Sequence, residues 1–387
     1  MDIVVGGYAE TKIQLRSGKS AYALAGEAFE TLLENTGLEK GEIDGLSVTM
    51  PLSEGSNTFF PVYMTDALGM TPRWLIGNAV GGCSALSGIA QAASAIRDGR
   101  CRLAVVISAD APSTAFRTSH GAFRPEFQSP MDINTPTPTF GMLMDRYAHQ
   151  NDLTTEALGK IAITQRGNAL LNRNAVDTLQ SPLTMANYLA SKMIADPMRM
   201  LDCVMPCDGA NAFLVMSRAE ARARGLKKMA RLVAYREITN AGATDSAHDI
   251  TNNGFERIAS DVFSDAAMAP SDIRSFQPYD DFTIAVLMQL EAFGFCEKGR
   301  SSAFVTQTDI SLTGQLPINT GGGQISAGQP GLAGGGLNVA EAVRQIYGEG
   351  EARQLGDASV ALVSGIGGVL YGRNWSVSSA MILEACA

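Results

Sequence analysis

The sequence predicts an α/β protein built from two similar halves. Stretches with helical spacing of apolar residues alternate with short apolar runs, which are typical of strands covered on both faces. The same order of patterns recurs in the second half of the chain. The 387 residues also exceed the size of an ordinary single core and suit a duplicated unit.

Each element of the first half has a local signal. Apolar residues recur at helical spacing from Ser20 to Thr36, and Gly37 follows. Because Ser is a favourable N-cap and Gly a common terminator, this stretch predicts a helix capped by Ser20. The elements expected after it are a strand over 43–48, a glycine turn at Gly81 and Gly82, a small-residue helix over 85–97 and a buried strand over 103–107.

The second half repeats this plan more loosely. The elements expected there are a strand over 272–276, a glycine turn from Asn319 to Gly323, a helix over 337–346 and a buried strand over 359–363. We therefore expect an N-terminal half over residues 1–230 and a C-terminal half over 231–387. A proline-rich stretch and two helical patterns, over 139–150 and 154–171, predict an insertion in the first half from about residue 112 to about residue 200.

Charge and composition exclude several classes of function. Thirty Lys and Arg against 39 Asp and Glu give a net charge of −9 without a basic cluster, so no nucleic-acid-binding face is expected. No run reaches about 18 apolar residues and no targeting segment is visible, so the sequence predicts a cytoplasmic protein without a membrane span. The six cysteines predict reduced thiols. No bound metal is expected, because Cys203 and Cys207 lack a second pair of ligands.

Histidine and serine patterns restrict the mechanism further. The histidines are His120, His149 and His248; they lie outside the motifs described below, so we expect them on the surface or in loops. Ser84 and Ser87 lack the Gly-x-Ser-x-Gly turn of a serine hydrolase. The glycine clusters match neither a P-loop nor a dinucleotide-binding fingerprint, so no nucleotide cofactor is expected.

Five motifs occur in a recognisable order along the chain. They are the Asn turn and small-residue helix over 78–99, the segment over 195–210, Tyr279 to Phe282, Asn319 to Gly323, and Gly365 to Gly368. Together they resemble the thiolase superfamily, specifically its sterol-carrier-protein and lipid-transfer-protein type branch. The resemblance implies a thiolase fold, with duplicated αβα halves in a five-layer αβαβα arrangement, a homodimer and an acyl-CoA substrate. Coenzyme A would be part of the substrate, and the chain itself would bind no cofactor.

The three thiolase catalytic positions hold other residues here. The position of the nucleophilic cysteine, counted back from Gly99, holds Gly82; the histidine of Gly-His-Pro is replaced by Gln329, and the second cysteine by Gly365. Cys83 is one position further along, which rotates its side chain by about 100 degrees around the helix. Glutamine can donate a hydrogen bond to a carbonyl but cannot take up a proton near neutral pH. Ordinary thiolase chemistry is therefore disfavoured.

Steroid side-chain aldolases of the same superfamily also lack this catalytic set and are understood to use two tyrosines. The first of their positions is Tyr279 here, and the second is Gln329. In a retro-aldol reaction a tyrosinate could remove the β-hydroxyl proton, while amide or backbone donors stabilise the enolate. The candidate catalytic residues are Tyr279, Gln329 and, for thiolase chemistry, Cys83. The residues expected around the substrate are Gly82, Ser84, Asn319, Gly322, Gly367, Gly368 and Tyr371.

The resemblance leads to one leading function and two alternatives. The leading function is an acyl-CoA enzyme of lipid metabolism that makes or breaks a carbon–carbon bond, by an aldolase-type reaction on a β-hydroxyacyl-CoA. The alternatives are an acetyltransferase or 3-ketoacyl-CoA thiolase that uses Cys83, and an inactive acyl-CoA-binding or scaffold subunit of a multienzyme complex. Relatives in this branch commonly work with a small OB-fold and zinc-ribbon protein, which is a candidate partner. The seventeen methionines weakly favour a bulky acyl group such as a steroid.

Overall fold

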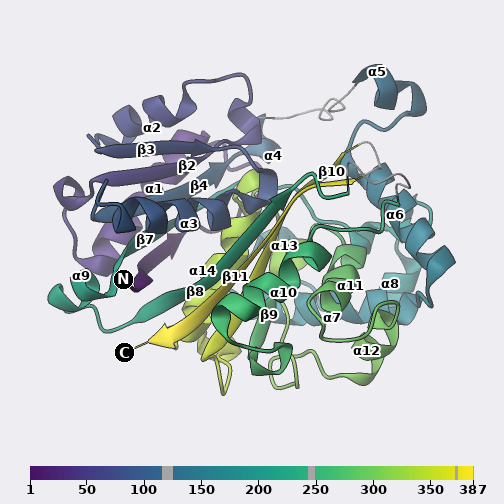
Figure 1. The fold of residues 1–387 in the computed structure, drawn as a ribbon. Helices are drawn as coiled ribbons and strands as arrows, with labels where there is room; N and C mark the ends of the chain where they lie inside the picture. Colours follow the sequence, from purple (N-terminus) through teal and green to yellow (C-terminus); the bar gives the residue numbers. More distant parts are fainter. Residues whose placement is uncertain (116–124, 243–248, 371–373, 387) are drawn as a thin grey trace.

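The computed structural model describes residues 1–115, 125–242, 249–370 and 374–386 of this α/β protein (Figure 1). Within these ranges the main sheet has nine strands in the order β3-β2-β4-β7-β1-β8-β11-β10-β9. A separate hairpin pairs β5 (Met193–Ala195) with β6 (Met198–Arg199). The main-sheet strands are β1 (Ile3–Glu10), β2 (Gly45–Thr49), β3 (Trp74–Asn78), β4 (Leu103–Asp110), β7 (Gly209–Ser217), β8 (Met229–Thr239), β9 (Ser275–Gln277), β10 (Val360–Leu370) and β11 (Asn374–Cys386).

The main sheet consists of two sections that meet between β1 and β8. Val4 and Val5 of β1 pair with Arg231 and Ala230 of β8. Counted outward from this junction, the strands run β1-β7-β4-β2-β3 on one side and β8-β11-β10-β9 on the other, so only the outermost β3 has no counterpart. The inner pairs are antiparallel and the outer pairs, β2 with β4 and β9 with β10, are parallel. The two sections thus repeat one topology. The expected division at residue 230, which lies within β8, stays a prediction.

The helices cover both faces of the two sections. They are α1 (Ala21–Thr36), α2 (Phe60–Leu68), α3 (Ser84–Arg97), α4 (Pro112–Ala115), α5 (Pro125–Gln128), α6 (Pro136–Gln150), α7 (Thr155–Leu170), α8 (Met185–Ala190), α9 (Arg218–Ala223), α10 (Phe255–Ala266), α11 (Thr283–Ala292), α12 (Ser301–Gln307), α13 (Gly323–Ala327) and α14 (Gly334–Ile346). Among the described helices, none is long and apolar enough to cross a membrane.

Alternate strand residues face different helices, and this alternation produces the layers. Leu103, Val105 and Ile107 of β4 join the core around α1, whereas Ala104 and Val106 face α3. Such alternation is expected for a strand covered on both faces. α3 and α14 pack against each other between the two sections, and α10 covers the outer face of the second section. The predicted five-layer αβαβα arrangement is confirmed.

The predicted elements are present, with shifted boundaries. The Ser20 hydroxyl accepts the Ala23 N–H at the start of α1, and Gly37 ends the helix at φ 67°. The helix predicted over 85–97 begins one residue earlier, and the strand predicted over 43–48 covers 45–49. The strand predicted over 272–276 begins only at Ser275, because Pro270 starts a 3₁₀ turn over 270–272. Both helices predicted in the insertion form, as α6 and α7.

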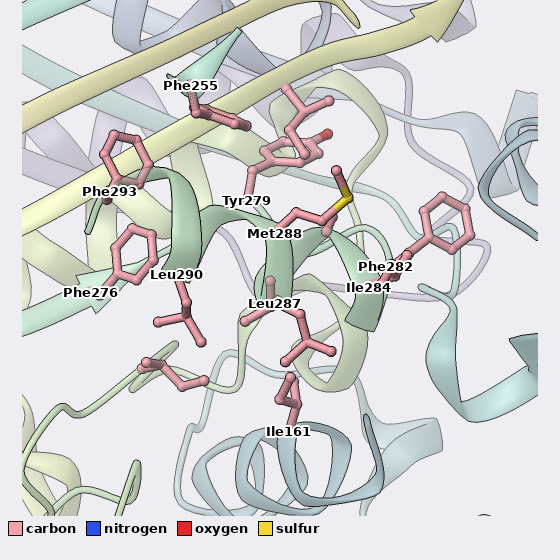
Figure 2. Packing of buried hydrophobic residues seen from close by; sticks show 14 of the residues in the cluster. Ile161, Phe255, Phe276, Tyr279, Phe282, Ile284, Leu287, Met288, Leu290 and Phe293 are labelled. Carbon is pink, nitrogen blue, oxygen red and sulfur yellow. The ribbon is translucent and has the colours of Figure 1, made fainter. Parts of the chain in front are cut away.

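The core of the second section surrounds α11, as Figure 2 shows. Leu287 on one side of this helix faces Ile161 of α7, whereas Tyr279 lies on the other side, towards β10 and β11. Tyr279 therefore belongs to the largest apolar cluster of the described chain.

A buried ion-pair network ties α14 to the loop that begins at Asn319. Glu341 of α14 accepts hydrogen bonds from Arg344 at 2.7 Å, Arg353 at 3.1 Å and the Thr320 hydroxyl at 2.9 Å. Burial opposes the ionisation of Glu341, but the two guanidinium groups outweigh it and lower the pKa of this carboxyl to about 2. The network therefore stabilises the folded state only while Glu341 is charged.

We predict that Glu341→Gln removes an acid-sensitive part of the stability. A pKa that is depressed in the folded state contributes stability above the unfolded pKa, near 4.5, and loses it as the pH falls towards 2. The shift corresponds to about 3 kcal/mol at neutral pH. Urea unfolding of wild type and variant should therefore differ most at pH 7, and the difference should shrink as the pH falls from about 4.5 towards 2. A difference that does not depend on pH would contradict the ionised state of Glu341.

Candidate active site

A cavity of about 460 Å³ lies where the two sections meet at the ends of their helices and strands. It is bounded by the turn before α3, the loop before α6, the segment over 203–206, the loop before α11, the Gln329 loop and the end of β10. The side chains that line it include Phe140, Phe282, Ile366, Leu332 and Val369, with polar groups from Gln128, Asn134, Tyr279, Asp281 and Gln329. A mainly apolar cavity with a few converging polar groups is the usual form of a small-molecule site.

Tyr279 is held at this cavity by its own backbone. It follows β9 directly after Pro278, its N–H donates to the Ser364 hydroxyl of β10 at 2.9 Å, and its carbonyl accepts from Gln289 of α11 at 2.8 Å. The Ser364 hydroxyl in turn donates to Gln289. These bonds fix the end of the strand between β10 and α11. The ring therefore enters the cavity from a rigid base.

The Tyr279 ring fills the space that a side chain at position 82 would need. A Cβ built on Gly82 would overlap the ring at Cε2, Cζ and the hydroxyl oxygen. Position 82 must therefore be glycine while Tyr279 keeps this conformation. Gly365 is similarly confined, because a Cβ there would lie 2.8 Å from the Ser379 hydroxyl and 2.9 Å from the Cys83 Cα. Neither position that holds a cysteine in thiolases has room for a thiol.

The Tyr279 hydroxyl remains protonated in this environment. Burial raises its pKa well above the ordinary value, and the neighbouring Asp281 and Cys83 raise it further, while an interaction with the Gln329 side chain opposes the shift. A tyrosinate base, considered from the sequence, is therefore disfavoured. The hydroxyl is instead suited to donate a hydrogen bond to an oxygen of a bound substrate.

Gln329 faces the cavity from a loop with a constrained backbone. It lies between Gly328, at φ 99°, and Pro330. Its N–H donates to the Met205 carbonyl at 3.0 Å, and its carbonyl accepts from Cys207 at 2.7 Å. These bonds join the loop to the segment over 203–206. The side-chain amide, which also donates to Gln324 at 3.3 Å, is thus presented beside the Tyr279 hydroxyl.

Two adjacent aspartates have opposite surroundings. Asp280 is fully buried and accepts the N–H groups of Gln324 and Ile325 together with the Gln165 side chain, at 2.9–3.2 Å. Asp281 lines the cavity, and its buried Oδ1 has no hydrogen-bond partner among the described residues. Burial and the charge of Asp280 raise the pKa of Asp281 well above the ordinary value. Asp280 is therefore a structural carboxylate, whereas Asp281 is available for chemistry.

The sequence alone does not identify Asp281 as a site residue. It occupies the unspecified position of the family pattern Tyr-Asp-x-Phe, so the motif itself gives no reason to select it. The available signal was its place beside Tyr279, one residue further along a loop already expected at the site.

The remaining predicted residues divide into two groups. Gly82, Gly367 and Gly368 line the cavity together with Tyr279 and Gln329. Four others are not among its lining residues: Cys83, Ser84, Asn319 and Gly322. Tyr371 lies outside the described residues.

The residues that do not line the cavity have structural contacts. Cys83 is fully buried, and desolvation raises the pKa of its thiol, which opposes formation of a nucleophilic thiolate. The Ser84 hydroxyl accepts the Val80 N–H at 3.2 Å. Asn319 donates to the Pro278 carbonyl at 2.9 Å and so supports the loop that carries Tyr279. Gly322 adopts φ 98° at the start of α13.

Among the described residues, no histidine lines the cavity. His149 is exposed in the last turn of α6, as expected, and His120 and His248 lie outside the described residues. In the described part of the chain, no three His, Cys, Asp or Glu side chains are grouped to hold a metal ion.

Comparisons with known proteins agree with this geometry. Residues 237–384 match the family model described as "Thiolase C-terminal domain-like". The chain is 29% identical to a steroid side-chain-cleaving aldolase of Thermomonospora curvata, over 94% of this chain and 95% of that protein. It is 28% identical to the 17-hydroxy-3-oxo-4-pregnene-20-carboxyl-CoA lyase of Mycobacterium tuberculosis, over 93% and 95%. The solved structure of the Ltp2-ChsH2(DUF35) aldolase is 27% identical, with a TM-score of 0.86 over 99% of this chain and 98% of that one.

We predict a strong coupling between positions 82 and 279. Gly82→Ala should destabilise the protein by about 1–3 kcal/mol, because the new methyl group overlaps the Tyr279 ring. In a Tyr279→Ala background the same change should cost much less. Urea unfolding of the wild type, both single variants and the double variant gives the coupling energy. Additive effects would show that the ring does not occupy this space. Gly41→Ala is a control for the loss of a glycine, because Gly41 lies in a 3₁₀ turn, as Gly82 does, and a Cβ there would meet nothing within 4 Å.

Proposed function

Because the chain belongs to the thiolase superfamily, in its sterol-carrier-protein-like branch, we propose that it is an acyl-CoA carbon–carbon lyase that acts without a cysteine nucleophile. The observation that carries this proposal is the overlap of the Tyr279 ring with any side chain at position 82. A mainly apolar cavity lies beside position 82, but the Tyr279 ring fills the space that a nucleophilic side chain at this position would need. A reaction that needs no acyl-enzyme is therefore favoured.

The reaction proposed is retro-aldol cleavage of a β-hydroxyacyl-CoA. A base removes the β-hydroxyl proton, and the oxygen forms a carbonyl as the Cα–Cβ bond breaks. The electron pair of that bond passes to the thioester as an enolate, which then takes up a proton at Cα. The products are an aldehyde or ketone and a shortened acyl-CoA. The site must therefore supply one base and at least one donor to the enolate oxygen.

The cavity residues fit these roles. We assign the base to Asp281, because its unpartnered oxygen lines the cavity and its raised pKa makes the carboxylate a stronger base. Tyr279, which stays protonated, donates to the thioester oxygen, and the amide of Gln329 is a second donor. After cleavage, protonated Asp281 can return its proton to Cα. In this assignment Gln329 acts only as a hydrogen-bond donor, so it does not have to take up a proton.

The acyl group and the partners are part of the same proposal. The apolar walls of the cavity suit a bulky acyl chain such as the steroid-derived groups named for the relatives. Coenzyme A would enter as part of the substrate. We also propose a homodimer and an accessory protein of the OB-fold and zinc-ribbon type, since a similar chain is found in the Ltp2-ChsH2(DUF35) aldolase. A cytoplasmic location remains a prediction.

The two alternatives make different demands on the site. A thiolase would need Cys83 as its nucleophile, yet this thiol is buried, protonated and absent from the cavity lining. A scaffold subunit would not need a polar group without a partner in its cavity, as Asp281 Oδ1 is. The geometry therefore supports the lyase more than either alternative.

We predict cleavage of β-hydroxyacyl-CoA in buffer without free CoA. The purified protein, alone and with a co-expressed accessory subunit, is incubated with β-hydroxyacyl-CoA thioesters whose acyl groups are either ring-bearing or straight-chain. The products are measured by mass spectrometry. A carbonyl fragment and a shortened acyl-CoA are expected from wild type and from Cys83→Ala. Tyr279→Phe should lower kcat by about 100-fold, since it removes a donor to the enolate. CoA-dependent thiolysis that is lost in Cys83→Ala would instead show a thiolase, and no turnover with any ester would favour the scaffold.

We also predict an acidic limb in the pH profile that belongs to Asp281. The base must be ionised, so kcat/KM should rise with pH through a midpoint above about 3.9, the ordinary value for Asp. Asp281→Asn should lower activity by at least about 100-fold and abolish this limb. Asp66→Asn, a change in an exposed residue of α2, is the control. An unchanged profile in Asp281→Asn would exclude this residue as the base.

A further inference from the structure

Arg166 of α7 is a buried cation that has no counter-ion among the residues that the structure describes. Its side chain is buried, with 7% of the residue exposed. Its Nη1 donates to the Ser181 carbonyl at 3.1 Å, and its Nε lies 3.4 Å from the Ser326 hydroxyl. Across the described residues, no carboxylate lies within ion-pair distance of this guanidinium, and its hydrogen bonds are made by Nε and Nη1 rather than by Nη2.

Two other strongly buried arginines differ from Arg166 because each is paired with a carboxylate. Arg344 is paired with Glu10 and Glu341, and Arg353 with Glu341. Such pairing offsets the cost of removing a charge from water. Arginine stays charged in proteins, so Arg166 carries that cost uncompensated. Binding of an anionic ligand would balance this charge.

Arg166 also lines a cavity of about 350 Å³ that is separate from the candidate active site. The cavity lies between α7, α13 and the segments over 179–183 and 200–206. Its walls are mainly apolar; they include Ala162, Leu183, Met200, Met205 and Ile325. Its polar surface is therefore concentrated at the guanidinium, which is how a site for an apolar ligand with one charged group is built.

We propose that this cavity binds the carboxylate of an organic acid with an apolar body, through the guanidinium of Arg166. A carboxylate matches the planar donors of a guanidinium, and one negative charge balances the one cation present. A phosphate dianion would need further donors that the apolar walls do not supply. The ligand class is thus a monocarboxylic acid of a size suited to the cavity, such as an aromatic or medium-chain acid.

The cavity shares a wall with the candidate active site. Cys203, Val204 and Pro206 line both cavities. The backbone of this wall holds the active-site loops, since the Val204 N–H donates to the Asp281 carbonyl at 3.2 Å and the Met205 carbonyl accepts from Gln329 at 3.0 Å. An acid bound at Arg166 would therefore contact the segment that positions Asp281 and Gln329. The binding itself does not depend on the proposed lyase activity.

Binding is tested by calorimetric titration with benzoate, using benzamide as a neutral probe of the same shape. Wild type should bind benzoate and discriminate against benzamide. Arg166→Met should weaken benzoate binding by at least about tenfold, which is about 1.4 kcal/mol, and Arg166→Lys should retain part of it. Arg236→Met is the matched control, because it removes one positive charge from an exposed arginine that is paired with Asp265. Equal benzoate binding by wild type and Arg166→Met, or no binding by wild type, would overturn the proposal.

The thermal stability of the ligand-free protein gives a second readout. If Arg166 serves a ligand, replacing the uncompensated charge by an apolar side chain of similar length should leave Tm unchanged or raise it. Benzoate should then raise the Tm of wild type but not that of Arg166→Met. A large fall in the Tm of ligand-free Arg166→Met would show that the guanidinium is a structural group, and it would contradict the proposal.

Discussion

The Tyr279 ring occupies the volume of a side chain at position 82, and the rest of the site depends on this exclusion. Tyr279, which belongs to the second section, thereby leaves no room for a nucleophilic side chain at position 82 of the first section. The overlap is possible because the strand end that carries the ring is fixed by Ser364 and Gln289. With the ring in place, the turn before α3 must remain glycine. The site then has a phenol where thiolases have a thiol, and the chemistry we propose for it is hydrogen-bond donation and proton transfer instead of nucleophilic attack.

Burial decides what each polar group of the loop before α11 can do. Asp280 is surrounded by donors from α7 and α13, so it holds the loop in place. Asp281, one residue later, lines the cavity, and its Oδ1 has no hydrogen-bond partner among the described residues. The same desolvation that keeps Tyr279 protonated makes Asp281 a stronger base. The proposed donor and base thus lie at neighbouring positions on one loop, and the proposed reaction requires no histidine.

The fold and part of the site could be predicted from the sequence, because their signals are local. The Ser20 cap, the glycine turns and the apolar runs predict elements that the structure contains, and the substituted motif positions identify Gly82 and Gln329. Asp281 and Arg166 could not be identified in this way. Their significance comes from missing partners, an unbonded oxygen for one and an absent counter-ion for the other. Such absences depend on what distant segments place nearby. β9 begins later than the strand pattern predicts, because Pro270 starts a 3₁₀ turn over 270–272.

The central claim is that no acyl group is transferred to the protein, and intact-protein mass spectrometry tests it most directly. The protein is mixed with β-ketoacyl-CoA or short acyl-CoA, quenched in acid during turnover and weighed. We expect the mass of the unmodified chain at every time point, because the thiol of Cys83 is buried and position 82 carries no side chain. A mass increase equal to the acyl group that maps to Cys83 and is absent in Cys83→Ala would contradict it.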